Sequence, residues 1–316
     1  MKLKALSNYD GDRNTRFGDC ILLYDAINLV VYDCGHERHA KEVKTFLEKH
    51  STIINVSIVV SHNDSDHTEG MAELLHWLYT KGNYSVAVYA HLYLKHADTI
   101  LDKIDDGRRN RESLKQALLD EFDNIRTVIE LAQNYGFSII EALPYTPVCK
   151  CSIVGPTVDE FTDTAAQAVD NRVSDYIGEG DARETVMNAA SIQLKCTLDD
   201  GNTILLCGDA SPDFLKNLNS YHYIQLPHHG QLKNATAIFR ELNDSYGKNY
   251  LISDNTGSGA TSGGSDELCR WMKNENYPAA FNTKSGVVHL PKTAPTIGIT
   301  AKNQGVRLGA MDRQCR

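Results

Sequence analysis

Apolar and polar stretches alternate along the 316-residue chain in a way that predicts a mixed α/β fold. Two short β-rich runs, at 21–24 and 29–32, flank the turn sequence DAIN and predict a hairpin. A third apolar run, at 54–60, predicts a buried strand. Segments 40–50 and 71–82 carry apolar residues at helical spacing. The first part of the chain therefore reads as strands separated by polar loops and helices.

The middle of the chain departs from this simple alternation. A further strand is expected at 85–89, and 92–136 is so rich in charged, helix-forming residues that it predicts a helical insertion. Strands are expected again at 138–143 and 149–154. The polar segment 156–185 predicts a long loop on the substrate side or a mobile cover.

The second half repeats the first in outline. Runs 191–198 and 203–209 flank the turn sequence DDGN at 199–202 and predict a second hairpin. A helix is expected at 211–218 and a short strand at 221–227. Two β-rich halves with helices outside them predict two sheets packed face to face and covered by helices.

Composition is that of a globular protein, with 41% hydrophobic and 23% charged residues. No apolar run is long enough to span a membrane, and the first residues lack the apolar core of a signal peptide. Most of the eight cysteines lie in apolar runs, where Cys behaves as a small hydrophobe, and Cys149 and Cys151 form CxC rather than a metal-binding or redox CxxC. We therefore expect a reduced, cytoplasmic protein with no membrane partner.

The formal net charge of −9 argues against a broad basic surface for long duplex nucleic acid. It leaves room for a local basic groove. The arginines of 105–115 are candidates for contacts with a phosphate backbone, although such a charge run is more often a solvated helix face.

Histidines and aspartates follow three of the expected strands. His62, Asp64, Asp66 and His67 fall within six residues directly after the strand at 54–60. Asp209 ends a later strand, and the pair His228-His229 ends the next. Loop carboxylates can also cap a helix, and Asp66 lies near the start of one, but two histidines at these spacings have no capping role. Imidazole and carboxylate ligands gathered at strand ends suit divalent hydrolytic metals.

Here the chain resembles the metallo-β-lactamase superfamily, whose signature is HxHxDH followed by a distant bridging Asp and a late His. Within it, the likeness is greatest to the metal-dependent domain of ComEC-type DNA-uptake proteins and their stand-alone relatives. The pieces that carry it span nearly the whole chain: Gly18-Asp19-Cys20, Asp33-Cys34-Gly35, His62 to His67, Asn188 with Ser191, Gly208-Asp209 and Pro227-His228-His229-Gly230. The resemblance implies an α/β fold, a four-layer αββα sandwich over residues 1–316, with 92–136 as a helical insertion.

The resemblance also implies roles for the clustered residues. One ion would be held by His62 and Asp64, the other by Asp66, His67 and His229, with Asp209 as the bridge. His228 would then point at the substrate.

Two departures from the family pattern matter. Asp64 stands where His is commoner, which favours manganese beside zinc as the bound metal. No third-motif His is evident between residues 70 and 220, because His76, His91 and His96 fall in or beside helical sequence. Asn188 lies near the expected position, so one ion would be held loosely or through water.

These features predict a metal-dependent hydrolase, a phosphodiesterase or nuclease acting on nucleic acid or a nucleotide. Two divalent ions, Zn²⁺ or Mn²⁺, would acidify a bridging water that attacks as hydroxide, with Asp66, His228 and Asp209 as catalytic residues.

Alternatives stay open at this point. One is hydrolysis of a small ester, thioester or lactam, since a fold does not fix a substrate. Another is an effector subunit of a multi-protein assembly, such as an antiviral defence system, activated by a protein partner from the same operon. The Gly/Ser-rich stretch at 256–265 is a candidate for phosphate binding through backbone N–H groups, or a flexible surface loop.

Overall fold

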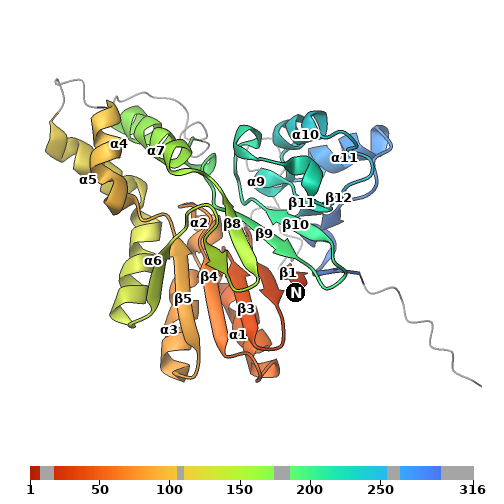
Figure 1. Ribbon diagram of the computed structural model, residues 1–316, viewed down its shortest axis with the longest axis horizontal. Coiled ribbons are helices and arrows are strands. Elements are labelled where there is room, and N and C mark those ends of the chain that lie inside the picture. The colour runs from red at the N-terminus through yellow and green to blue at the C-terminus, as the bar shows by residue number, and fades with distance from the viewer. Residues whose placement is uncertain (8–17, 105–109, 174–185, 255–263, 293–316) are drawn as a thin grey trace, which may run out of the picture.

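The computed structural model describes residues 1–7, 18–104, 110–173, 186–254 and 264–292. Within these ranges the chain forms two seven-stranded mixed sheets with helices on their outer faces (Figure 1). None of the helices described is both long and apolar enough to cross a bilayer.

The first sheet is built from the N-terminal half of the chain and one late strand. Its order is β14 (Val288–Leu290), β1 (Lys2–Ala5), β2 (Ile21–Tyr24), β3 (Asn28–Tyr32), β4 (Asn55–Val59), β5 (Ser85–Ala90) and β6 (Ser138–Glu141). Strands β14 to β3 pair antiparallel, and β3 to β6 pair parallel. The expected hairpin at 21–32 and the buried strand after it are therefore confirmed.

The second sheet mirrors this plan. Its order is β13 (Phe281–Asn282), β12 (Asn249–Ile252), β11 (Tyr223–Gln225), β10 (Thr203–Leu206), β9 (Gln193–Thr197), β8 (Cys151–Gly155) and β7 (Pro147–Val148). Strands β7 to β10 pair antiparallel, and β10 to β13 pair parallel. Both sheets thus have a parallel half whose carboxyl edge can carry a site.

Strand β3 shows how the two sheets share a core. Leu29 and Val31 pack into the outer core under the helices, whereas Val30 and Tyr32 pack into the core between the sheets. This is the alternation that a strand buried on both faces requires. A third cluster covers the outer face of the second sheet. Three cores between four layers confirm the expected αββα sandwich.

Helices cover the first sheet on one side and the second on the other (Figure 1). Those associated with the first sheet are α1 (Glu37–Lys49), α2 (Ser65–Thr68), α3 (Met71–Lys81), α4 (Ala97–Ile104), α5 (Arg111–Glu121), α6 (Asp123–Asn134) and α7 (Val158–Val173), with the short 3-10 helix η1 (Tyr93–His96). Those of the second sheet are α9 (Pro227–Gly230), α10 (Leu232–Glu241) and α11 (Asp266–Asn274), with the 3-10 helices η2 (Pro212–Phe214), η3 (Leu218–Ser220) and η4 (Thr283–Ser285). The described residues of the segment expected to be a helical insertion, 92–136, form mainly helices, η1 and α4 to α6.

The prediction of a long polar loop at 156–185 is wrong for its first half, which forms helix α7. Thr157 and Glu160 make a capping box: the Glu160 carboxylate accepts from the Thr157 N–H at 2.9 Å, and the Thr157 hydroxyl accepts from the Glu160 N–H at 3.2 Å. Phe161, Ala165 and Val169 follow at helical spacing and are buried. Residues 174–185 lie outside the described part of the chain. The capping box was a sequence signal for this helix.

The helix expected at 211–218 is also not formed. Two short 3-10 helices, η2 and η3, take its place, and Asn217 between them has a left-handed backbone with φ of 55°. A residue in that conformation ends an α-helix, because the chain cannot continue the right-handed path through it.

Candidate metal centre

The expected ligands come together where the carboxyl ends of strands from both sheets meet. His62 follows β4 of the first sheet, and the loop after it leads into the single helical turn of α2. Asp209 follows β10 of the second sheet, and His229 follows β11. The site is therefore assembled by the packing of one sheet on the other.

Asp64 does not act as a helix cap, which was one way to read the first cluster. Asp64 is the residue before α2, but its side chain makes no capping hydrogen bond. Its Oδ2 atom instead accepts a hydrogen bond from Asn188 Nδ2 at 2.7 Å, across 124 residues of sequence.

Each of the three site histidines has its Nδ1 atom fixed by the protein. Nδ1 of His67 lies 2.8 Å from Asp33 Oδ2, and Nδ1 of His229 lies 3.0 Å from both Asp19 Oδ1 and the Ser253 carbonyl oxygen. Nδ1 of His62 lies 2.9 Å from the Ser61 hydroxyl and 3.2 Å from that of Ser191. Holding one ring nitrogen fixes the ring's orientation and leaves the other for a metal.

The other ring nitrogens, the Nε2 atoms, converge on carboxylates. His229 Nε2 lies 3.2 Å from Asp66 Oδ2 and 3.7 Å from Asp209 Oδ2. His67 Nε2 lies 3.5 Å from Asp209 Oδ1. His62 Nε2 lies 3.9 Å from Asp209 Oδ2 and 3.7 Å from Asp64 Oδ2. Asp209 thus faces all three imidazoles, as a bridging carboxylate would.

These Nε2 atoms fit a metal site on a further ground. All three are buried, and none has a hydrogen-bond partner within the described part of the chain. A buried polar atom without a partner costs about 1–3 kcal/mol, so three at one point call for a ligand that satisfies them together. Divalent cations accept imidazole nitrogen and carboxylate oxygen in the same shell.

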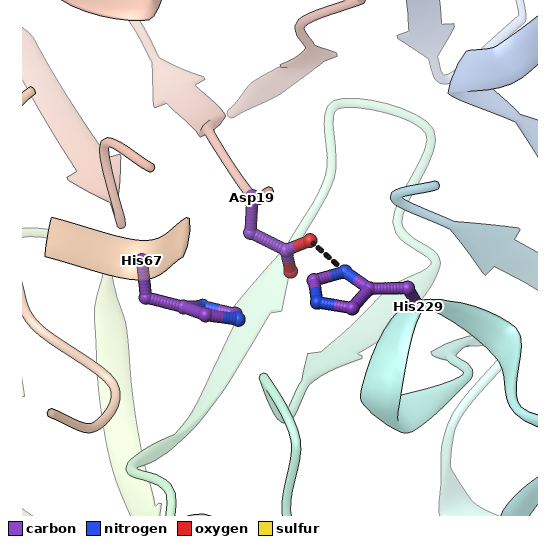
Figure 2. Close-up of side chains that lie close together, drawn as sticks. All are labelled: Asp19, His67 and His229. Carbon is purple, nitrogen blue, oxygen red and sulfur yellow. Dashed lines mark hydrogen bonds and ion pairs between the residues drawn. The ribbon is translucent and has the colours of Figure 1, made fainter. Parts of the chain in front are cut away.

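Two groups of residues each bring three potential ligand atoms within 4.8 Å of one another. One group is His62, His67 and Asp209, and the other is Asp19, His67 and His229. Figure 2 shows the second set, with the His67 and His229 rings turned toward a common space and Asp19 bonded to the near edge of His229. Because Asp19 engages Nδ1, we assign it to orienting His229 rather than to binding the ion.

Charges at the site offset one another strongly. Burial alone would lower the pKa of His67, but Asp209 and Asp33 raise it well above its ordinary value. Burial would likewise lower the pKa of His229, but Asp209 and Asp19 raise it well above its ordinary value. Burial would raise the pKa of the Asp209 carboxyl, yet His229 and His67 hold it well below its usual range. Without a metal ion, the raised pKa values favour positively charged His67 and His229 rings beside the negatively charged carboxylates. A bound cation would supply that positive charge instead.

His228 differs from its neighbour. Its ring is half-buried, and burial lowers its pKa, so it is the neutral imidazole of the pair at pH 7. Its backbone N–H donates to Asp209 Oδ1 at 3.1 Å. The ring planes of His228 and His229 stand nearly perpendicular, at 86°. The pair therefore offers one buried ring among the carboxylates and one at the edge of the site.

The backbone at two glycines explains part of the motif pattern. Gly18 has φ of +62°, and a Cβ there would lie 1.6 Å from the Asp66 carbonyl oxygen. Gly208 has φ of +50°, and a Cβ there would lie 2.9 Å from the Ser61 hydroxyl oxygen. Only glycine lets the chain pass so close to these residues in a left-handed conformation.

Sequence reasoning gave no role to several residues that shape the site. Asp19 and Asp33 were noticed as parts of family motifs, but not as the partners of His229 and His67. His91, expected in or beside helical sequence, lies between β5 and η1, is 6% exposed, and has the Ala190 carbonyl oxygen 2.9 Å from its Nε2 atom. The signal was available, since polar residues just after parallel strands gather at one edge.

Other candidate features are only partly described. Arg111 does not stand free for a phosphate, because its guanidinium donates to Asp102 at 2.8 Å and to Asp98 at 3.0 Å. Arg108 and Arg109 lie outside the described residues, as does most of the Gly/Ser-rich stretch, 256–263. Cys149 lies in the turn between β7 and β8 and is exposed, while Cys151 is buried.

No protein-family model matches the chain, and no curated protein sequence is significantly similar to it. Solved structures that resemble it include proteins described as metallo-β-lactamases or as metallo-β-lactamase fold proteins, and a diphosphatase. "A New Diphosphatase from the PhnP Family" is 11% identical with a TM-score of 0.44, covering 89% of this chain and 94% of its own.

Two further similar structures are more distant in shape. The metallo-β-lactamase fold protein YhfI from Bacillus subtilis is 12% identical with a TM-score of 0.36, over 71% of this chain and 70% of its own. A metallo-β-lactamase-like protein from Thermotoga maritima is 11% identical with a TM-score of 0.34, over 66% and 76%. At these scores the likeness carries no argument about activity, so the function has to be argued from the site.

Proposed function

We propose that the protein is a hydrolase that depends on two divalent metal ions and cleaves phosphodiesters in nucleic acid or nucleotides. The observation that carries the proposal is the set of three buried Nε2 atoms, on His62, His67 and His229, that have no hydrogen-bond partner among the described residues and face shared carboxylates. We assign His62 and Asp64 to one ion and Asp66, His67 and His229 to the other, with Asp209 between them. The metallo-β-lactamase superfamily, and within it the ComEC-type domain, is the family we propose.

The charge of the filled site favours an anionic substrate. Two divalent ions carry four positive charges, against three from the carboxylates of Asp64, Asp66 and Asp209. The ions and their assigned ligands together then carry one net positive charge, with the carboxylates of Asp19 and Asp33 behind two of the imidazoles, on a chain whose formal charge is −9. A phosphodiester would be attracted to that centre and repelled elsewhere. When bound, the ions supply Lewis-acid stabilisation of phosphoryl charge and lower the pKa of water.

The chain's own groups have separate tasks in this proposal. Asp19 and Asp33 hold the rings of His229 and His67, so that their Nε2 atoms stay aimed at the site. Asp66 lies at the edge of the same space and orients the attacking water. His228, kept neutral at pH 7 by burial, is suited to stabilise charge on the leaving oxygen by donating a hydrogen bond to it.

The carboxylate content also bears on the metal. Three carboxylates and three imidazoles form an oxygen-rich shell, which manganese accepts at least as readily as zinc. We therefore propose that Mn²⁺ supports the reaction at least as well as Zn²⁺.

The test is hydrolysis of bis-p-nitrophenyl phosphate by metal-free protein reloaded with Mn²⁺ or Zn²⁺. We expect turnover with either ion and a loss of at least about 100-fold in Asp209→Asn, as for removal of a main electrostatic contributor. Asp200→Asn is the matched control, because Asp200 lies in the exposed β9–β10 turn of the same hairpin. Single-stranded DNA, duplex DNA, RNA and cyclic nucleotides then define the substrate. Hydrolysis of an ester, thioester or lactam, with no diester cleaved under any metal, would contradict the proposal.

A further inference from the structure

In the described part of the chain, the amide side chain of Asn188 contacts one of the expected ligands, Asp64. Asn188 is 1% exposed, ends the helical residues 186–188 and begins the turn 188–191 that precedes β9. Its Nδ2 atom donates to Asp64 Oδ2 at 2.7 Å. Its backbone carbonyl oxygen accepts from the Ser191 N–H at 2.9 Å and from the Ser191 hydroxyl at 2.7 Å. The side chain and the turn that carries it are therefore fixed.

Chemistry sets the orientation of this amide. A carboxylate oxygen can only accept, so the end of the amide that faces Asp64 must be the nitrogen. The oxygen Oδ1 is then turned away from Asp64. It is buried and has no hydrogen-bond partner within the described residues. It shares this condition with the Nε2 atoms of His62, His67 and His229.

The same turn contacts two other members of the site. The Ser191 hydroxyl lies 3.2 Å from His62 Nδ1 and accepts from the Asp209 N–H at 3.2 Å. Asn188 contacts Asp64, whose Oδ2 atom is 3.7 Å from His62 Nε2. The turn thus contacts three groups assigned to the same ion, His62, Asp64 and Asp209, and it carries one buried oxygen, Asn188 Oδ1, that has no hydrogen-bond partner among the described residues.

We infer that Asn188 Oδ1 is a fourth protein ligand of the ion held by His62, Asp64 and Asp209. The inference rests on the metal centre proposed above. An amide oxygen is a hard, neutral donor of the kind that Mn²⁺, Mg²⁺ and Ca²⁺ accept. The two metal sites then differ in their ligands. The site that includes Asn188 has one imidazole and otherwise oxygen ligands, whereas the other site has two imidazoles together with Asp66 and Asp209. This ion is held directly by Asn188, in place of the loose or water-mediated contact expected from sequence.

The experiment separates the two ends of the amide. Mn²⁺ is titrated calorimetrically into metal-free protein carrying Asn188→Leu or Asn188→Asp, with no substrate present. Leu removes both the oxygen and the N–H donor, whereas Asp keeps one oxygen, replaces the donor with a second oxygen and adds a negative charge. We expect Asn188→Leu to weaken binding of one of the two ions at least about 100-fold, the upper range for losing an outer partner. Asn188→Asp should stay within about tenfold of the wild type, because a carboxylate is also a ligand.

Asn202 provides the matched control, since its Nδ2 atom also donates to a carboxylate, Asp200 Oδ2, at 2.8 Å in the β9–β10 turn. Asn202→Leu and Asn202→Asp should leave both ions bound as in the wild type. Thermal melts of each metal-free variant check that it folds, and if Asn188→Leu does not fold, Asn188→Ala takes its place.

Equal loss of the ion in both Asn188 variants would overturn the inference, because it would show that only the N–H contact to Asp64 matters. Unchanged binding in both variants would overturn it too, and would place Oδ1 against substrate. Failure of the proposed function would look different, since the wild type would then bind two ions without cleaving a diester.

Discussion

At the scale of single residues, His228 and His229 show how adjacent side chains take different positions. Both have a left-handed backbone, with φ of 53° and 54°, and Gly230 after them has φ of 83°. Such a run is strained for residues other than glycine, and strain of this kind gathers at functional sites. It turns the His229 ring in among the carboxylates and leaves the His228 ring at the edge of the site.

The two histidines should therefore respond differently to substitution. His229→Ala removes a nitrogen that faces Asp66 and Asp209, so it should lower both the metal content and the activity. His228→Ala should leave the metal bound and lower kcat by roughly 100-fold, the low end for loss of a hydrogen-bond donor that stabilises developing negative charge. Metal content by elemental analysis, together with diester turnover, checks both. If His228→Ala were the variant that lost metal, the roles assigned to the pair would be reversed.

The candidate ligands could be identified from the sequence because His and Asp at short fixed spacing have few structural uses. His62, Asp64, Asp66 and His67 are close in the chain as well as in space. The residues that orient them were harder to assign. Asp19 lies 210 residues from His229, and nothing local in the sequence links the two. The sequence pointed to Asn188 only through the pairing of Asn188 with Ser191 in the family motif. Its contact with Asp64 depends on how the two sheets pack.

At the scale of elements, β5, α7 and the turn before β9 meet at His91. Its ring stacks on Phe161 of α7 with ring centroids 4.1 Å apart, and its Nε2 atom holds the Ala190 carbonyl oxygen. Burial lowers the pKa of His91 to about 4, although the Ala190 carbonyl and Glu141 oppose the shift. The ring is therefore neutral in the folded protein at pH 7.

This contact predicts a dependence of stability on pH. The unfolded chain takes up a proton at His91 near pH 6.5 and the folded chain only near pH 4. The stability from the neutral ring is thus complete above pH 6.5 and is lost as the pH falls toward 4. Between pH 7 and pH 5 this loss is about 2 kcal/mol. The free energy of unfolding of the metal-free protein is measured with urea at pH 7 and at pH 5. It should fall between these two pH values by about 2 kcal/mol less in His91→Gln than in the wild type. The same fall in both proteins would show that His91 does not carry this dependence.

Periodicity predicted the elements with long, regular patterns, such as α1, α3 and strands β2 to β5. Periodicity and composition gave the wrong secondary structure in two segments, where local hydrogen bonds or backbone conformation decided the outcome. Segment 158–173 is polar enough to look like a loop, but its capping box and one small apolar stripe make it helix α7. Segment 211–218 has helical composition, but the left-handed Asn217 divides it.

At the scale of the whole molecule, the site joins the two sheets. Asp64, Asp66 and the first two histidines come from the first sheet, and Asp209 and His229 from the second. Contacts between the sheets surround the site: Gln225 Nε2 donates to Asp19 Oδ2 at 2.6 Å, and the Tyr32 hydroxyl donates to the Ile192 carbonyl oxygen at 2.6 Å. The sandwich could be predicted from two β-rich halves, but the register of one sheet on the other could not, because it depends on side chains from distant parts of the chain.

The most direct test of a two-ion centre is the metal content of the purified chain. Protein saturated with Mn²⁺ or Zn²⁺ and freed of excess ion should contain two ions per chain by elemental analysis, since six His and Asp side chains supply two shells with Asp209 shared. Asp209→Asn should lower that content, because the substitution removes the charge that both ions share. A content of zero in the wild type under all metals would contradict the account, and the buried Nε2 atoms would then need another partner.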